Sequence, residues 1–561
     1  MGPFEFANTT VRSGARLRDG LLAISKSDKE GKLRERKGDL ALIDILESNE
    51  VIDFYGESTY SVGRKWRSAM CKMGFLFDKY GHSQSEIGRM DFITPNGRRL
   101  IEADSLAAQQ ESFLRAISAM QVSFNGRSYK AGPGFSPFKH IINLMLNLRN
   151  EYGNSAISMV EFACFAQFDP GIYGLDKAVF DLREYRKERL KAANKKQFDN
   201  QAIKHAVSRH GRVAASSYLD YADENLRYLK ATGCFTAQGR GIAINEYKYP
   251  LLLELSQSIP EQSSYEDYWK TITSGAKLPT DNHEEAVRNL EALQSEAANR
   301  GIPFSHISSS SDIKVLSNAR YDLEELIALN QELDYARAQA SKWEEILQYI
   351  AALLPKDARP KQIAQEIEVE IPRGEAPAYL EWAVWRAFLA INKIKNPPYE
   401  SRKFKIDRDF LPISHAPGKG PDLVFEFESF ILVVEVTLLT TDRQATAEQV
   451  GVRRHVYEIA KAVKSKPVYC LFLAPHIKNE TARDFRKASY EEDNGAELNL
   501  TIIPLTLRTF MQLFSKIQMN PQLDYQIFQE LITRVSMLSQ ESNSTSTWMD
   551  AIEKTFELSQ N

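Results

Sequence analysis

The sequence has few cysteines and no long apolar run. Its four cysteines, at positions 71, 164, 234 and 470, are far apart and form no CxxC pair, so neither a disulfide framework nor a zinc ribbon is expected. The N-terminus shows no signal-peptide or myristoylation pattern, and the longest apolar runs, such as residues 430–434, are too short to span a bilayer. These absences predict a cytoplasmic protein without a membrane partner.

The sequence also lacks an excess of either charge. Its 71 Lys and Arg residues nearly cancel its 74 Asp and Glu residues, which excludes a histone-like basic protein. The balance hides a gradient, because residues 1–250 hold 37 basic against 29 acidic residues and residues 251–350 hold 8 against 17. A basic half can bind phosphates, although surpluses of this size are also common on solvated surfaces.

The length and composition indicate several globular domains. The chain has 561 residues, 43% of them hydrophobic and 26% charged, so at about 100–200 residues per domain three or four compact units are expected. The predicted fold class is multidomain α+β. Its parts are winged-helix-like DNA-recognition units at 1–110 and 111–250, an acidic helical connector at 251–360, an α/β domain with a central mixed sheet at 361–520, and a peripheral helical tail at 521–561.

Two segments of the basic half are typical of winged helices. Residues 62–77 form a predicted basic helix, and residues 92–104 are predicted to form a strand, a Pro-Asn-Gly turn and a helix. Residues 155–166 have the size of a helix in a helix-turn-helix, and residues 235–247 form a predicted hairpin with an arginine at its tip. The alternative is that the Gly-Arg sequences are ordinary surface turns. The residues predicted to contact DNA are Arg64, Lys65, Arg67, Arg98, Arg99 and Arg240.

Two acidic residues of the predicted sheet are the candidates for catalysis. Asp422 opens the predicted strand 422–429 after a Gly-Lys-Gly-Pro turn, and Glu435 lies in the most apolar predicted strand, 430–439. An ionised carboxylate in such a strand is costly unless a cation or a donor meets it. Two strands joined by a tight turn can bring these residues side by side, where oxygen ligands favour Mg²⁺. Order and spacing therefore predict a metal-dependent nuclease centre.

Two further acids bear on this site. Glu448 lies at the start of the predicted helix 445–463, and Glu381 lies on the apolar helix 379–392, where an acid needs a partner such as a metal. His455, on the predicted helix 445–463, could face the DNA, but a histidine on a helix surface is more often structural. The acids also have structural interpretations that the sequence leaves open: Glu435 as an edge-strand acid paired with Arg443 or Arg454, Glu381 in a salt bridge with Arg386, and Glu448 compensating the charge of a helix N-terminus.

The motifs around these acids resemble those of a known family. The run Pro421-Asp422 followed by Glu435-Val436-Thr437 resembles the PD-(D/E)XK nuclease signature in the form used by type IIS restriction endonucleases. More closely, the stretch 433–455 and the opening residues 8–21 are similar to the AlwI family with its MlyI and PleI relatives. The resemblance implies a bacterial enzyme with an N-terminal DNA-recognition region and a FokI-like PD-(D/E)XK cleavage domain at the C-terminus.

The resemblance also implies a metal site. Asp422 and Glu435 would bind one or two Mg²⁺ ions, with the Val436 carbonyl as a further ligand. Glu381, as another metal ligand, and Glu448 would be supporting acids of the catalytic centre.

One residue departs from the general signature. Thr437 occupies the position that usually holds a lysine, and a threonine hydroxyl cannot supply a positive charge at the scissile phosphate. Relatives with a Glu-Val-Thr motif share this replacement, so it does not argue for inactivity. Gln444, Glu448 and a second metal ion are the candidates for the role of the missing lysine.

The implied activity is that of a type IIS restriction endonuclease. Such an enzyme binds a short asymmetric site in double-stranded DNA, possibly GGATC, and cuts at a fixed distance outside it. One centre hydrolyses one strand, so two cleavage domains would dimerise transiently on DNA, and a cognate methyltransferase would be a genetic partner. The alternatives are a strand-specific nicking endonuclease and a DNA-binding protein with an inactive nuclease domain.

Overall fold

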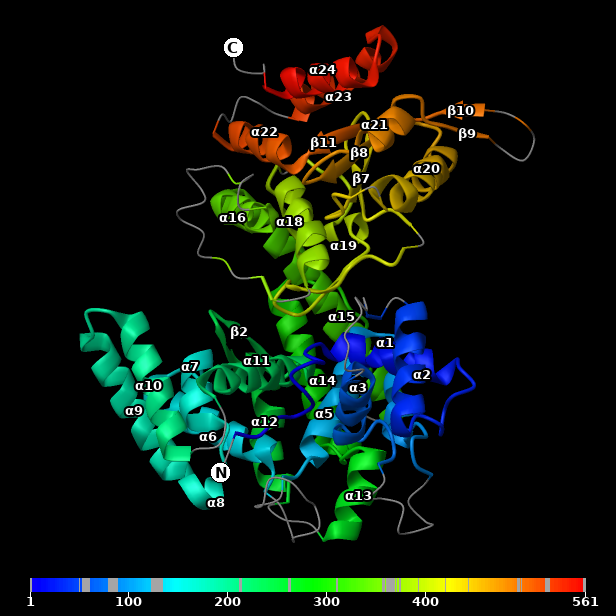
Figure 1. Cartoon of the computed structure of the whole chain (residues 1–561). Coiled ribbons are helices and arrows are strands. Elements are labelled where there is room, and N and C mark those ends of the chain that lie inside the picture. Colours follow the sequence, from blue (N-terminus) through cyan, green and yellow to red (C-terminus); the bar gives the residue numbers. More distant parts are fainter. Residues whose placement is uncertain are drawn as a thin grey trace. The chain divides into compact units, whose positions relative to one another are not determined.

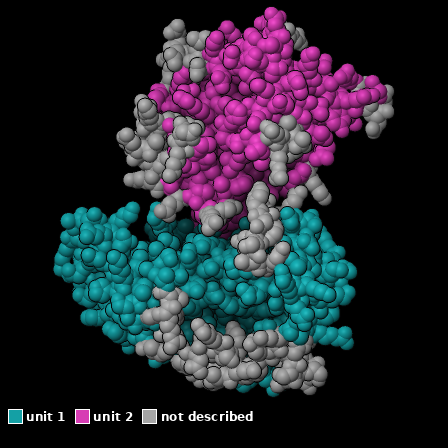
Figure 2. Space-filling model, viewed as in Figure 1, with its two compact units in different colours: residues 1–328 teal, residues 329–561 magenta. Residues whose placement is uncertain are grey.

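The computed structural model divides the chain into two compact units, unit 1 with residues 1–328 and unit 2 with residues 329–561 (Figure 2). The residues that the structure describes are 3–49, 51–52, 61–78, 89–122, 135–210, 214–260, 264–308, 311–355, 359, 369, 371–372, 375–391, 393–418, 420–441, 443–491, 495, 497–519 and 525–557.

Unit 1 is mainly helical and carries one small antiparallel sheet of order β1-β3-β2 (Figure 1). Its strands are β1 Ile157–Ser158, β2 Phe235–Gln238 and β3 Gly241–Ile244. Its helices are α1 Gly14–Ser25, α2 Glu35–Ser48, α3 Ser61–Lys72, α4 Pro95–Glu102, α5 Leu106–Ala119, α6 Pro137–Tyr152, α7 Met159–Glu161, the π-helix η3 Phe162–Ala166, α8 Pro170–Tyr173, α9 Leu175–Lys191, α10 Lys195–His210, α11 Ala215–Ala231, η4 Glu246–Lys248, α12 Tyr249–Ser258, α13 Tyr265–Ser274, η5 Pro279–Asp281, α14 His283–Asn299 and the first part of α15 Ile313–Ala338.

A single hydrophobic core joins the parts of unit 1 that the sequence analysis divided. This core extends from Phe4 to Leu278. Aromatic side chains link its early and late segments, because the ring of Phe113 lies 5.5 Å from that of Phe75 and 6.2 Å from that of Tyr228. The structure therefore differs from the predicted division into separate units at 1–110 and 111–250, since long-range packing merges them.

The first predicted wing is a helix. Thr94 caps α4 by accepting a hydrogen bond from the Gly97 backbone N–H at 3.0 Å, and Pro95 occupies the first helical turn, where its missing N–H costs nothing. The Pro-Asn-Gly sequence thus forms the first turn of the helix, where a separate turn before the helix was predicted. The prediction of a helix at 155–166 was also wrong in part, because β1, α7 and η3 share that segment.

The second predicted hairpin is present. Strands β2 and β3 pair antiparallel, with Gln238 opposite Gly241, so Arg240 lies in the turn. Gly241 has no side chain because a Cβ there would lie 1.9 Å from the Ile157 carbonyl oxygen of β1. The third strand, β1, pairs with the outer side of β3 and completes the sheet.

The predicted acidic connector does not form one body. Residues 251–278 belong to the core of unit 1, and α14 with the first half of α15 forms a smaller cluster. The division between the units falls within α15, and the structure ends this helix at Ala338, before η6 Gln339–Lys342 and α16 Trp343–Leu353. None of the helices in the described part of the chain combines the length and apolar character needed to cross a membrane.

Unit 2 is built on a four-stranded mixed sheet of order β11-β8-β7-β6. Strands β11, β8 and β7 are parallel, and β6 pairs antiparallel with β7 at one edge. The strands of this unit are β4 Lys405–Ile406, β5 Pro412–Ser414, β6 Leu423–Glu426, β7 Ile431–Val436, β8 Val468–Ala474, β9 Ser489–Glu491, β10 Glu497–Asn499 and β11 Thr501–Thr506. Its further helices are α18 Ala376–Ile391, α19 Pro398–Ser401, α20 Arg443–Ala462, α21 Asn479–Arg486, α22 Leu507–Met519, α23 Tyr525–Glu541 and α24 Thr545–Glu557.

The C-terminal segment is part of the core of unit 2, so its prediction as a peripheral tail was wrong. Trp548, Ile552 and Phe556 are fully or almost fully buried and recur every four residues, so they form one apolar face of α24. This face packs against α21, α22 and β11. The all-round apolar α18 is buried as predicted and packs against α16, α22 and β6.

Candidate active site

The β6–β7 register brings the two principal acids together. Leu423 pairs with Val434, so the next position in the register sets Asp422 opposite Glu435. The Oδ2 atom of Asp422 accepts a hydrogen bond from the Val436 backbone N–H at 2.9 Å. The carboxyl groups of Asp422 and Glu435 are themselves within hydrogen-bonding reach. A spacing of thirteen residues in the sequence thus becomes a direct neighbour relation at the end of two strands.

Glu435 lies in a central strand. Its strand β7 has β6 on one side and β8 on the other, so the interpretation of Glu435 as an edge-strand acid was wrong. Only 6% of Glu435 is exposed, and its Oε1 lies 2.8 Å from Nδ1 of His455 on α20. The partner is therefore an imidazole in place of Arg454, while the side chain of Arg443 lies outside the described residues.

Glu381 faces the same group of acids from α18. Its Oε2 accepts a hydrogen bond from the Ala416 backbone N–H at 2.7 Å. Arg386 does not form the alternative salt bridge, because its guanidinium donates to Gln339 at 2.7 Å and to Glu345 at 2.9 Å. Glu381 is thus a buried acid without a cationic partner among the described residues.

Glu448 approaches from α20. It is the sixth residue of this helix, past the first turn, and its carboxylate accepts a hydrogen bond from the Thr437 hydroxyl. Glu448 therefore does not simply compensate the partial charge of the helix N-terminus, which was the structural alternative. Thr437 continues β7 by donating its N–H to the Leu473 carbonyl at 2.9 Å and is itself buried.

The electrostatics of this group are those of acids that lack a counter-charge. Burial, and then the charge of Glu448, raises the pKa of Glu435 to about 8. Burial also raises the pKa of Asp422 and of Glu381 well above the usual range, with Glu435 and Asp422 respectively as the next cause. The pKa of Glu448 is raised by burial as well. The set of Glu381, Asp422, Glu435 and Glu448 is called the carboxylate cluster below.

The contacts of Gln444 do not suit the role of the missing motif lysine. It is fully buried, and its amide nitrogen donates to the carbonyls of Leu439 at 2.7 Å and His476 at 2.8 Å. Its amide oxygen accepts from the Lys478 backbone N–H at 2.9 Å. Every polar atom of this side chain therefore fastens the loops that follow β7 and β8.

His455 is the functional candidate that the sequence analysis missed. It was interpreted as structural, yet it is buried and contacts Glu435 directly. Arg454 lies beside its other ring nitrogen, with Nη2 at 3.4 Å from Nε2. Burial and then this guanidinium lower the pKa of His455, which favours the neutral imidazole. Its seven-residue spacing from Glu448, two helical turns on one face, was the available signal.

The donor set of the cluster suits a divalent cation. Carboxylate and carbonyl oxygens are the ligands of Mg²⁺, which keeps several waters and takes only one or two carboxylates. Among the described residues, no group of three His, Cys, Asp or Glu side chains is already placed to hold a metal ion. The raised pKa values of Asp422 and Glu435 nevertheless fit a site that a cation would complete, because a bound cation favours the ionised carboxylates.

The basic residues predicted to contact DNA have different surroundings in unit 1. Arg64 is exposed on α3, whereas Arg67 on the same helix lies 3.4 Å from Asp39. Arg98 pairs with Glu30 at 2.5 Å, and Arg99 donates to Asn96 and to the Ser274 carbonyl. Lys65 is half-buried on α3, and Arg240 is exposed in the β2–β3 turn. Of the six residues, Arg64, Arg98, Arg99 and Arg240 are therefore exposed, and the guanidinium groups of Arg98 and Arg99 take part in the packing of unit 1 through these contacts.

Comparison with known proteins identifies the family of this chain and, with it, the class of enzyme. Unit 2 combines a mixed sheet with a cluster of acids at the ends of adjacent strands. The model of the AlwI restriction endonuclease family matches residues 71–513, so the chain belongs to this family and is a type II site-specific deoxyribonuclease. The match includes most of unit 1 as well as the carboxylate cluster. A comparison with curated proteins found no match.

Two solved structures are similar to parts of the chain. The small subunit of the heterodimeric restriction endonuclease R.BspD6I is 24% identical over 37% of this chain and 97% of its own, with a TM-score of 0.28. The BpuJ1 endonuclease binding domain, in complex with pyrene- and phenanthrene-modified DNA, is 13% identical over 42% of this chain and 86% of its own, with a TM-score of 0.30. The family assignment therefore rests on the sequence match.

Proposed function

We propose that this DNA-cleaving enzyme is a type IIS restriction endonuclease. It binds a short asymmetric duplex site, such as GGATC, and hydrolyses phosphodiester bonds at a fixed distance outside it with Mg²⁺. The observation that carries the proposal is the pair of half-buried Asp422 and buried Glu435, which lie opposite each other at the ends of β6 and β7 with raised pKa values. Because the cluster belongs to a compact unit distinct from the basic N-terminal part, cleavage need not occur at the bound sequence.

Asp422 and Glu435 would hold Mg²⁺ with the Val436 carbonyl, and Glu381 would be a further ligand. When bound, Mg²⁺ supplies Lewis acidity toward the scissile phosphate and the attacking water. His455 orients Glu435 through the 2.8 Å contact between Nδ1 and Oε1. The buried walls of the site limit the water that competes for the carboxylates, so their charge acts strongly on a ligand.

Other residues of the site act on position or charge. Thr437 holds Glu448 by its hydroxyl but supplies no positive charge. Gln444 keeps the loops after β7 and β8 in place, so its proposed contribution is to positioning. A second metal ion would then supply the positive charge that the usual motif lysine carries. Glu448 is the nearby acid that could bind this ion.

A single digestion tests the proposal. A plasmid of known sequence is incubated with the full-length protein with and without Mg²⁺, and the product ends are sequenced. Ends at a constant offset from one shared asymmetric motif, formed only with Mg²⁺, are the expected result. An intact plasmid at every metal and enzyme concentration would contradict the proposal and favour a DNA-binding protein with an inactive nuclease domain.

The same digestion distinguishes double-strand cleavage from nicking. Within the described residues there is one carboxylate cluster, and one such centre hydrolyses one strand. Double-strand breaks therefore require two cleavage domains that meet transiently on DNA, and the rate of linear product should rise with the square of enzyme concentration at low occupancy. Open-circular plasmid that never becomes linear would show a nicking enzyme. Protection of the plasmid by a cognate methyltransferase would complete a restriction–modification pair.

A matched pair of variants tests the residues. Asp422→Asn should abolish cleavage and preserve site-specific DNA binding, because it removes a metal ligand without changing side-chain volume. Glu426→Gln is the control, since Glu426 lies at the other end of the same strand pair, opposite Ile431, and bonds Lys466 at 2.7 Å. Equal activity loss in both variants would contradict the assigned roles.

A further inference from the structure

Helix α10 has one buried face and one exposed face. Ile203 and Ala206 are almost fully buried, and the helix packs against α9, α11 and η3. Figure 1 shows α9 and α10 side by side as a helical hairpin of unit 1. All residues of α10, from Lys195 to His210, belong to the described part of the chain, so its exposed face can be examined completely.

The exposed face of α10 is a stripe of uncharged hydrogen-bonding side chains with one lysine. Its members recur at intervals of three and four residues and therefore project from the same side of the helix. All of them are exposed. The stripe consists of Gln197, Asn200, Gln201, Lys204, His205 and Ser208.

These side chains are available to a ligand. Within the described structure, the amides of Gln197, Asn200 and Gln201 take part in no side-chain hydrogen bond or ion pair, whereas the Ser208 hydroxyl donates to the Lys204 carbonyl at 2.7 Å. The neighbouring helix α9 is different, because its exposed Lys187 and Lys191 pair with acids one turn away on the same helix. The outer face of α10 thus lacks the internal pairing that is typical of a merely solvated helix.

No exposed residue of α10 is acidic. The helix has one acid, Asp199, which is half-buried and bonded to Tyr185 at 2.6 Å and Arg189 at 2.7 Å. A DNA duplex that approached this face would meet no exposed carboxylate of α10, although the whole chain carries a formal net charge of −3. Lys195 and Lys196, both exposed at the start of the helix, add positive charge for the phosphate backbone.

The chemistry of the stripe matches the edges of bases. An Asn or Gln amide presents a donor and an acceptor together and pairs with adenine, and lysine binds the acceptors of guanine in the major groove. A helix of 16 residues is about 24 Å long and fits that groove. We propose that α10 is the helix that reads the DNA sequence, with Gln197, Gln201 and His205 among its base contacts. This inference rests on the proposed site-specific function.

The test is a selection of binding sequences. Full-length protein carrying Asp422→Asn is used to select duplexes from a randomised pool, which yields its preferred sequence without cleavage. The same selection is made with Gln197→Ala, Gln201→Ala and His205→Ala added together. The control adds Lys177→Ala, Lys187→Ala and Lys191→Ala instead, because these exposed lysines of the neighbouring helix pair with Asp181, Glu184 and Glu188.

The expected result is a loss of specificity in the α10 variant alone. Its affinity for the selected duplex relative to a scrambled duplex should fall at least about tenfold, while binding of the scrambled duplex and its salt dependence stay unchanged. The lysine control should keep the preferred sequence. Circular dichroism and an unchanged unfolding midpoint confirm that each variant is folded.

Three results would overturn the inference. An unchanged specificity ratio would exclude base reading by α10, and an equal loss for both duplexes with a lower salt slope would show phosphate contacts only. A parent protein without any preferred sequence would contradict the proposed function as well. Gln201→Glu sharpens the test, because it exchanges an amide donor for an acceptor at nearly constant volume and should shift the preference at one position toward cytosine.

Discussion

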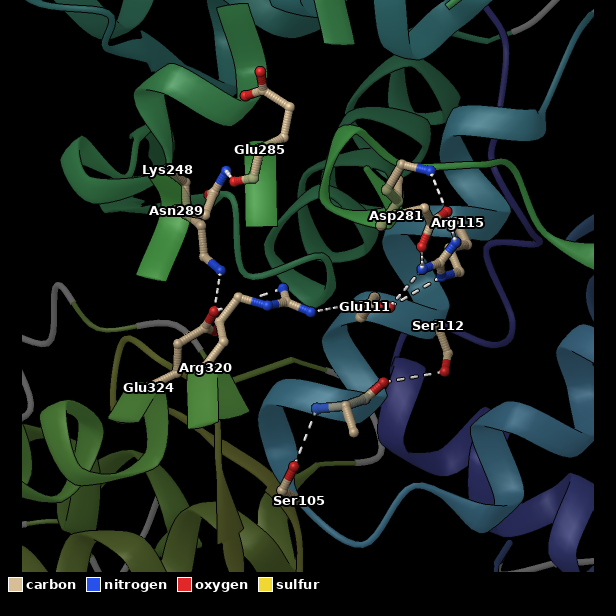
Figure 3. Close-up of polar contacts among 12 residues, drawn as sticks. Ser105, Glu111, Ser112, Arg115, Lys248, Asp281, Glu285, Asn289, Arg320 and Glu324 are labelled. Carbon is tan, nitrogen blue, oxygen red and sulfur yellow. Dashed lines mark hydrogen bonds and ion pairs between the residues drawn. The ribbon is translucent and has the colours of Figure 1, made fainter. Parts of the chain in front are cut away.

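Each unit of the protein contains a group of buried charges, and the two groups are arranged in opposite ways. In unit 1, Glu111 bonds Arg115 at 2.7 Å and also pairs with Arg320, while Glu324 bonds Lys248 at 2.5 Å (Figure 3). Burial alone would raise the pKa of Glu111, but Arg320 and Arg115 hold it at about 2. The acids of this group are therefore neutralised by cations of the protein itself.

In unit 2 the buried acids face one another. Glu381 and Asp422 each accept a hydrogen bond from a backbone N–H, Glu435 shares one with the His455 imidazole, and no described lysine or arginine bonds the three acids. The pKa of Glu435 is about 8, where that of the equally buried Glu111 is about 2. A completed ion network thus stabilises unit 1, whereas an incomplete one leaves unit 2 ready to accept a cation. Burial of an acid indicates a binding site only when its partners are missing.

Glu435→Gln should give the largest effect on activity. Cleavage should fall on the order of 10³-fold or more, because the metal contributes several kcal/mol of transition-state stabilisation. The free energy of unfolding without metal should not fall, since glutamine keeps the volume and removes a buried like charge. Plasmid cleavage rates and urea unfolding at pH 7 measure both quantities. A lower free energy of unfolding for Glu435→Gln would contradict the difference between the paired acids of unit 1 and the acids of unit 2 that lack a lysine or arginine partner.

Glu111→Gln should have the opposite profile. Removing one partner of a buried ion network leaves Arg320 and Arg115 without compensation and should cost about 3–5 kcal/mol of unfolding free energy. Urea unfolding of the variant measures this loss. Glu184→Gln, which breaks the exposed pair with Lys187, is the control and should leave the unfolding midpoint unchanged. Equal midpoints for wild type and Glu111→Gln would contradict a structural role for the network.

Mg²⁺ should stabilise unit 2 through the carboxylate cluster. At a concentration of 100 times the Kd, the gain in unfolding free energy is about 2.7 kcal/mol for the wild type, and it should be smaller for Glu435→Gln. Urea unfolding in EDTA and in MgCl₂ gives the difference for each protein. The same gain in both would place the bound metal elsewhere.

Stability should also depend on pH through Glu224, a buried acid of unit 1 that has no cationic hydrogen-bond partner among the described residues. It is fully buried on α11, accepts hydrogen bonds from the backbone N–H groups of Phe6 and Ala7, and has its pKa raised to about 8 by burial and then by Glu5. A raised folded-state pKa means that stability is present below about pH 4.5 and is lost as the pH rises toward 8, by at most about 1.4 kcal/mol per pH unit.

Glu224→Gln tests this pH dependence. Unfolding by urea at pH 5 and pH 8 should show a larger loss of stability for the wild type than for the variant, because glutamine does not ionise. Parallel losses in both proteins would mean that Glu224 does not titrate in this range. Since Glu224 is remote in sequence from the carboxylate cluster, the measurement also separates the pH response of the fold from that of the active site.

The sequence predicted the structure of unit 2 better than that of unit 1. Strands β6 and β7 and the apolar helix α18 were located within a few residues, because β-branched runs and apolar helices are local signals. The helix α4 was mistaken for part of a wing, since a Pro-Asn-Gly sequence fits a turn as well as a first helical turn. Helix α23 falls within the predicted helical tail 521–561, but the burial of its Ile532 and Val535 was not predicted.

The sequence by itself determined the principal acids and the family. The spacing of Asp422 and Glu435, with an apolar strand around the second, was sufficient to predict that they meet, because antiparallel pairing across a short turn is a local event. Tertiary structure alone decided the other partners. Glu381 lies 35 residues from its donor Ala416, and Glu111 lies 209 residues from Arg320. Whether a buried acid meets a cation or another acid depends on such long-range packing, which no local pattern encodes.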